Sequence, residues 1–181
     1  MSLHLAFYLA SWGMYRDSSF LLQKDYKVLS PVVEEVLKPE YDCLFGVACA
    51  DLREPEVQVM LTKLYDYIAD YFRPIRDEVA GCEVASSVSP VLVTKILMGT
   101  LGCVPAYDRF FQDGVATHKV TTQEYSLKSV LRLVDFYEEH NDRLEETRRG
   151  MQCEDLTYPQ MKVLDMGFWQ VGFEKDAGSA K

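Results

Sequence analysis

The sequence predicts an all-α fold, formed by a single compact multi-helix domain of about eight helices. Apolar residues recur with helical rather than alternating period through most of the chain. Residue types that cap helices stand where those patterns begin. The chain has 181 residues, of which 48% are hydrophobic, and this is enough to bury a core without a disulfide or a metal. We expect residues 1–173 to form the domain and residues 174–181 to form a flexible tail.

The first expected helix covers residues 3–14, and a second follows after a short connection. Residues 3–14 are apolar on nearly every side. Since a surface helix would keep a polar face, we expect this helix at the centre of the core. Ser18 and Ser19 are residue types that cap helices, so they predict a second helix that reaches about Val28.

Caps and prolines mark the remaining helices. Their starts are signalled by Ser30–Pro31, Asp51–Glu54, Ser89–Pro90, Pro105, Thr121–Glu124 and Thr157–Pro159. The helices expected from these signals span residues 31–38, 55–72, 91–101, 106–111, 122–149 and 158–173. Residue types that stop helices mark three of the ends, at Pro39, Pro74 and Gly114.

Residues 44–50 are the one stretch with two structural alternatives. The run from Phe45 to Cys49 has the length and apolar content of a short buried strand, and equally of a loop packed against the core. Both alternatives stay open, so the prediction allows at most one short strand near residues 44–50. No internal repeat or long linker divides the chain, which favours one domain.

The cysteines and the lengths of the apolar runs indicate a cytoplasmic protein. The five cysteines are scattered in apolar or mixed surroundings, which is typical of reduced thiols. None has the short paired spacing of a zinc site, so we expect no metal and no cofactor. No apolar run approaches the roughly 20 residues that a membrane-spanning helix needs, so we expect no membrane partner.

The charge of the chain argues against DNA as a ligand and for a protein partner. The net charge is −9, whereas DNA binding draws most of its affinity from Lys and Arg side chains that neutralise phosphates. Residues 34–56 hold seven acids and two bases, a local charge of −5. We expect this surface to bind an unidentified protein partner. Its partner-binding residues are Glu34, Glu35, Glu40 and Asp42.

One stretch carries a candidate catalytic pair. Lys95 stands on an otherwise apolar helix, and after a glycine-rich break the run from Pro105 to Asp108 begins the next helix. Over residues 86–111 this arrangement resembles the lysine and aspartate of helix-hairpin-helix DNA glycosylases. The resemblance implies Lys95 as a Schiff-base nucleophile and Asp108 as the group that stabilises the developing positive charge. A lysine on an apolar helix also tends toward a depressed pKa, which supplies neutral amine.

The residues themselves allow a plainer interpretation of this pair. The stem of Lys95 can lie along its apolar helix with the amine in water. Asp108 can cap its own helix or pair with a neighbouring base such as Arg109. Residues 88–92 also lack the glycines that the glycosylase family places in the hairpin before the lysine, which puts phosphate binding in doubt.

Two functions of different class follow from these observations. The first is an intracellular helical protein that acts through protein contacts, with no evident catalysis. It would use the acidic surface described above or the charged helical stretch at residues 135–149. The alternative is a glycosylase-like protein, active or degenerate, with Lys95 and Asp108 in the lysine and aspartate roles.

Overall fold

The apolar periodicity of the sequence produces helices throughout the chain. A computed structural model describes residues 1–16, 19–80 and 88–179. These residues form eight α-helices and four 3-10 helices, with one isolated bridge between Cys153 and Leu156, so the all-α prediction is confirmed. The α-helices are α1 (Ser2–Ser11), α2 (Ser30–Val36), α3 (Pro55–Ala80), α4 (Pro90–Thr100), α5 (Arg109–His118), α6 (Leu127–Glu139), α7 (Asn141–Gly150) and α8 (Gln160–Ser179). The 3-10 helices are η1 (Phe20–Gln23), η2 (Tyr26–Leu29), η3 (Pro39–Leu44) and η4 (Ala50–Arg53).

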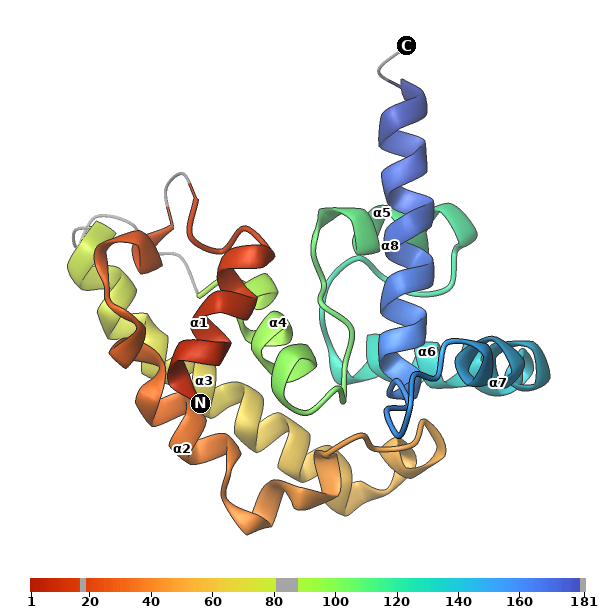
Figure 1. Cartoon of the computed structure of the whole chain (residues 1–181), viewed down its shortest axis with the longest axis horizontal. Coiled ribbons are helices and arrows are strands. Elements are labelled where there is room, and N and C mark those ends of the chain that lie inside the picture. Colours follow the sequence, from red (N-terminus) through yellow and green to blue (C-terminus); the bar gives the residue numbers. More distant parts are fainter. Residues whose placement is uncertain (17–18, 81–87, 180–181) are drawn as a thin grey trace.

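Helix α4 lies between the group formed by α1 and α2 and the group formed by α5 to α8 (Figure 1). Every residue of α4 from Leu92 to Met98 is buried, which explains why the helix is apolar on nearly every side. Helix α3 runs diagonally past α1 and α2 (Figure 1) and packs against α2 and α4. Its core-facing side chains include Leu61, Leu64, Ile68 and Phe72, which are all fully buried.

Helix α1 is less buried than its sequence predicts. Leu5 and Leu9 are buried in the core, whereas Leu3 is 47% exposed and Phe7 is 68% exposed. The expectation of a central helix over residues 3–14 is therefore wrong. Only one face of α1 packs against the rest of the molecule, and the apolar residues of the other face contact water.

The expected helix over residues 19–28 forms two short 3-10 helices, η1 and η2, instead. Lys24 has an extended backbone between them (φ −122°, ψ 147°). Asp25 accepts the Lys27 N–H through its side chain (2.8 Å), and such local bonds compete with helical ones. Ser18 of the expected cap lies outside the described residues. Of the alternatives for residues 44–50, the structure has the loop, which connects η3 to η4.

Helix α3 continues through Pro74 to Ala80, so the expected stop at Pro74 is wrong. A proline inside a helix removes one hydrogen bond and costs about 3 kcal/mol. Packing on both sides of it offsets this cost. Phe72 is fully buried and Ile75 packs against the core, while the Tyr71 hydroxyl donates to the Val28 carbonyl oxygen (2.8 Å).

Helices α5 and α8 pack with their backbones in direct contact. A Cβ at Gly114 of α5 would overlap the carbonyl oxygen of Phe168, and one at Gly172 of α8 would overlap that of Phe110. The prediction that a helix of residues 106–111 ends at Gly114 is wrong, because α5 passes through this glycine to His118. Glycine is needed there because the neighbouring helix leaves no room for a side chain.

The expected helix over residues 122–149 divides at His140 into α6 and α7. Ser126 caps α6 by accepting the Ser129 N–H (3.1 Å), and Thr121 donates to the Ser129 carbonyl oxygen instead of capping (3.1 Å). The predicted capping box at Thr121 is therefore wrong. Helix α8 reaches Ser179, through most of the residues expected to be a tail. Within the described ranges, no helix has the length and apolar content needed to cross a membrane.

Candidate functional site

Lys95 and Asp108, the candidate catalytic pair, come together in the interior. Lys95 belongs to the buried helix α4, and Asp108 caps α5 by accepting the Phe111 N–H (3.2 Å). The Lys95 Nζ lies 3.5 Å from Asp108 Oδ2, and the two side chains are 6% and 14% exposed. The Lys95 amine also donates to the Trp12 carbonyl oxygen (2.9 Å). The amine is therefore held inside the protein rather than placed in water.

A second lysine and aspartate adjoin this pair. Asp165 of α8 lies 2.7 Å from the Lys162 Nζ and accepts the Ala106 N–H (2.9 Å). The Nζ atoms of Lys95 and Lys162 lie 5.7 and 5.0 Å from the centroid of the Trp12 ring, within the range of cation–π contacts. The cluster joins the turn after α1 to α4, α5 and α8. Sequence analysis missed Lys162 and Asp165, whose only local signal is their i,i+3 spacing.

Burial shifts the pKa values of this cluster. It lowers the pKa of Lys95, and the neighbouring Asp108 carboxylate opposes that shift. It raises the pKa of Asp165, against the effect of Lys162. It also raises the pKa of the Tyr8 hydroxyl, and the carboxylates of the cluster add to that shift. A lysine with a depressed pKa holds more neutral amine, which is the form that acts as a nucleophile.

At the start of α4, before Lys95, the backbone N–H groups of the described residues bond within the chain. Pro90 has no N–H, the Val91 N–H donates to the Ser89 hydroxyl (3.3 Å), and the Leu92 N–H donates to the Ser89 carbonyl oxygen (3.0 Å). Residues 86 and 87 of the resemblance lie outside the described residues. A phosphate bound at the start of α4 would have to displace these two bonds.

Two of the four acids expected on the partner-binding surface are held by other residues. Glu35 is 6% exposed, and its carboxylate accepts a hydrogen bond from the Tyr41 hydroxyl (3.1 Å) and pairs with Lys38 (2.7 Å). Glu40 is exposed but forms an ion pair with Lys63 (2.6 Å). Glu35 therefore satisfies a buried hydroxyl instead of facing solvent, because α2 turns this position toward the core.

The other two acids, Glu34 and Asp42, are exposed, and neither has an ion-pair partner among the described residues. Asp42 lines an apolar cavity of about 470 Å³ formed by α1, α2, η3 and the last turn of α4. The cavity lining includes Leu37 and Phe45, which are 55% and 73% exposed. Sequence analysis missed this cavity because the apolar run around Phe45 indicates burial, whereas its side chain faces water.

The charged stretch at residues 135–149 is tied to the rest of the molecule at Glu145. Its carboxylate accepts hydrogen bonds from the Tyr137 hydroxyl (2.8 Å) and the Gln160 side-chain amide (2.7 Å), and it pairs with Arg148 (2.8 Å). The hydrogen bonds from Arg148 make the largest contribution to lowering the Glu145 pKa to about 2. This carboxylate therefore holds α6, α7 and α8 together.

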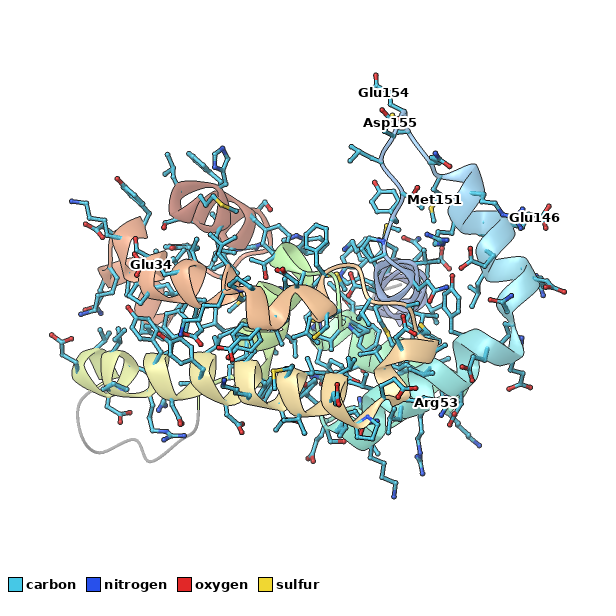
Figure 2. All side chains as sticks on the ribbon, turned by 90° about the horizontal axis from the view of Figure 1, so that it is seen from below. Glu34, Arg53, Glu146, Met151, Glu154 and Asp155 are labelled. Atoms are coloured by element: carbon cyan, nitrogen blue, oxygen red, sulfur yellow. The ribbon has the colours of Figure 1, made fainter. Side chains whose placement is uncertain are left out.

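Arg53 neutralises two further carboxylates of this stretch. Its guanidinium lies 2.7 Å from Asp135 and 2.6 Å from Glu138, which ties η4 to α6. Figure 2 labels Arg53 near the lower edge of the molecule. Across residues 1–16, 19–80 and 88–179, no group of three or more His, Cys, Asp or Glu side chains is placed to hold a metal ion.

Two arrangements of side chains in the molecule could therefore react with or bind a ligand. The Lys95 cluster can supply a buried amine next to a carboxylate. The exposed carboxylates of Glu34 and Asp42, of which Asp42 lines an apolar cavity, can attract a cationic group. Comparisons with protein-family models, curated proteins and solved structures find no match to this chain.

Proposed function

We propose that this chain is a non-enzymatic binding protein of the cytoplasm that holds a basic protein partner through Glu34 and Asp42. The observation that carries the proposal is the position of these two carboxylates. Both are exposed and without an ion-pair partner among the described residues, and Asp42 lines an apolar cavity. Carboxylates that no base of the same chain neutralises can pair with a base of another.

The physical properties of this region suit protein contact. Exposed carboxylates attract and orient a basic partner, and the net charge of −9 extends that attraction beyond contact distance. Exposed apolar side chains gathered at one place, here Leu37 and Phe45, supply area that a partner can bury. Electrostatic steering and apolar burial therefore act at the same place.

The cysteines support the cytoplasmic part of the proposal. Cys43, Cys49, Cys103 and Cys153 all carry free thiols. Free thiols are typical of proteins in a reducing compartment, because secreted proteins tend to form disulfides. Burial also raises the pKa of Cys49 to about 12, which keeps that thiol protonated and unreactive.

The test is a pull-down from a cell extract with three proteins: the parent, the double variant Glu34→Lys/Asp42→Lys, and the control Glu146→Lys. Glu146 is an exposed acid of α7, on the opposite side of the molecule from Glu34 (Figure 2). We expect the parent and the control to retain the same partner at low salt and to lose it at high salt. The double variant should lose it at low salt. A partner set that is the same for all three proteins and indifferent to salt would contradict the proposal.

A second candidate function is a DNA-glycosylase-like activity, favoured by the 3.5 Å contact between Lys95 and Asp108. In this chemistry the neutral amine displaces the damaged base from its sugar carbon, and the adduct opens to an imine while the carboxylate stabilises the positive charge. Because Lys95 is 6% exposed and donates to the Trp12 carbonyl oxygen, the turn after α1 would have to move aside first.

Borohydride trapping tests this second candidate. The reagent delivers a hydride to the imine and leaves a stable amine that links protein to DNA. The candidate predicts an adduct on duplexes with damaged bases for the parent and for Lys162→Ala, which removes the neighbouring lysine, and none for Lys95→Ala. Absence of an adduct across a broad panel of lesions, together with no DNA binding at low salt, would exclude it.

A further inference from the structure

Two cavities adjoin at the last turn of α4. The first, of about 470 Å³, is the one that Asp42 lines. The second, of about 600 Å³, lies between the loop before η4 and the segment at residues 155–160 that leads into α8. Both cavities are lined by Phe45, Gly99, Thr100 and Leu101. The two cavities are therefore neighbours, and we call them together the α4 groove.

Among the unpaired charges of the α4 groove, negative ones outnumber positive ones. Asp42 lines one cavity and Asp155 the other, and neither has an ion-pair partner among the described residues. Three basic groups also line the groove: the Met1 amino group, His4 and Arg148. Arg148 is neutralised by Glu145 (2.8 Å), which leaves the Met1 amine against the two carboxylates. The last carbonyl groups of a helix lack partners within it and carry partial negative charge, so the end of α4 adds to this field. The groove is therefore complementary to a cationic occupant.

Apolar side chains border the α4 groove along its length. Those that are most exposed are Leu37 (55%), Phe45 (73%), Leu156 (76%) and Tyr158 (43%). Phe45 and the last turn of α4 line both cavities, so an occupant that fills both must extend past this turn.

We propose that the α4 groove seats an amphipathic helix of the partner, with Leu or Phe side chains in the two cavities and Lys or Arg side chains beside Asp42 and Asp155. The inference rests on the proposed binding function and names the segment that is bound. An extended peptide would instead add to the edge of a sheet. The described residues offer no such edge beyond the isolated bridge of Cys153 and Leu156. A helix presents anchors at i, i+3, i+4 and i+7, and this spacing lets one face reach both cavities.

The experiment is a calorimetric titration of the full chain with designed peptides of about 18 residues, long enough for a stable amphipathic stripe. The first peptide contains Leu at helical spacing and Lys elsewhere. The second replaces every Lys with Glu, and the third keeps the first composition in scrambled order. We expect the first peptide to bind at least about tenfold more tightly than the other two, and added salt to weaken it.

Pairs of protein variants, one inside the groove and one outside it, show where the first peptide binds. Phe45→Ser removes an exposed ring that both cavities share, and Leu22→Ser removes an exposed apolar side chain (52%) that lies on η1. We expect Phe45→Ser to weaken the first peptide about tenfold and Leu22→Ser to change its affinity less than about twofold. Asp42→Lys should weaken it about fivefold, and the distant Glu146→Lys less than about twofold.

The outcomes separate this inference from the function on which it rests. If Asp42→Lys loses affinity and Phe45→Ser does not, the acidic surface still binds the partner. The inference that a helix lies in the α4 groove would then be wrong. Equal affinity for the Lys and Glu peptides, indifferent to salt, would overturn both. If sedimentation finds that the parent is a dimer and that Phe45→Ser is a monomer, a second copy of the chain fills the groove and the inference is wrong.

Discussion

The Lys95 cluster and the α4 groove both place charge beside apolar side chains, but they satisfy that charge differently. Lys95 is 6% exposed, with the Asp108 carboxylate 3.5 Å away and the Trp12 carbonyl as a hydrogen-bond acceptor. Asp42 faces water next to a cavity of about 470 Å³ and has no ion-pair partner among the described residues. A buried pair that is already satisfied orders the fold and gains little from a ligand. A free carboxylate beside apolar surface gains directly from a partner, and this difference is why we propose the groove as the binding site.

Among the variants that test this difference, we expect Asp108→Asn to change the free energy of unfolding most. Asparagine still caps α5, but Lys95 loses its nearest carboxylate and keeps only the more distant Asp165 of the cluster. We expect unfolding in urea to show a loss of about 3 kcal/mol, because a buried charge that has lost its nearest counter-charge is costly. The double variant Lys95→Met/Asp108→Asn should recover part of the loss. An Asp108→Asn protein as stable as the parent would mean that the pair is not held as described.

A smaller change in the free energy of unfolding should distinguish Glu35 from Glu34, two adjacent acids of α2. Glu35→Leu leaves the fully buried Tyr41 hydroxyl without its acceptor, and we expect a loss of about 2 kcal/mol in the free energy of unfolding. Glu34→Leu changes an exposed side chain and should stay within about 0.5 kcal/mol of the parent. Chemical denaturation of both variants measures the difference. Equal losses would show that Glu34 is also used inside the fold.

The smallest expected effect concerns Glu145, whose pKa is lowered to about 2 chiefly by its hydrogen bonds with Arg148. A carboxyl with a lowered pKa in the folded state stabilises the fold above its ordinary pKa and loses that contribution as the pH falls through the folded value. Parent stability should therefore fall by about 1 kcal/mol between about pH 4.5 and pH 2, after allowing for screening by solvent.

The Glu145→Gln protein provides the control for this pH dependence. It lacks the titrating carboxyl, so its stability should be lower at neutral pH and should fall less between about pH 4.5 and pH 2. Thermal unfolding monitored by circular dichroism at several pH values gives both curves. Parallel curves for the two proteins would show that Glu145 does not hold α7 in place.

Much of the helical architecture could be predicted because it depends on local pattern. The cap at Ser89 and the apolar run after it define α4 without reference to the rest of the chain. Gly114 and Pro74 are misleading because their roles depend on residues far away in sequence. Gly114 faces the backbone of Phe168, and Pro74 is tolerated because the helix around it is anchored in the core.

The candidate sites were predictable to different degrees. The resemblance singled out Lys95 and Asp108, which the fold brings within 3.5 Å. Glu35 was placed on the surface wrongly, although its position three residues after Val32 and one before Val36 puts it on the apolar face of α2. The α4 groove combines four or more separate elements, so no local pattern in the sequence could indicate it.

The most direct test of the account compares Lys95→Met with Asp42→Lys by two measurements, the free energy of unfolding and the affinity for the Leu/Lys peptide. We expect Lys95→Met to lose about 2 kcal/mol of stability and to bind the peptide as the parent does. Asp42→Lys should stay within about 0.5 kcal/mol of the parent in stability and bind the peptide about fivefold more weakly. A folded Lys95→Met protein that has lost affinity, beside an Asp42→Lys protein that has not, would contradict the account.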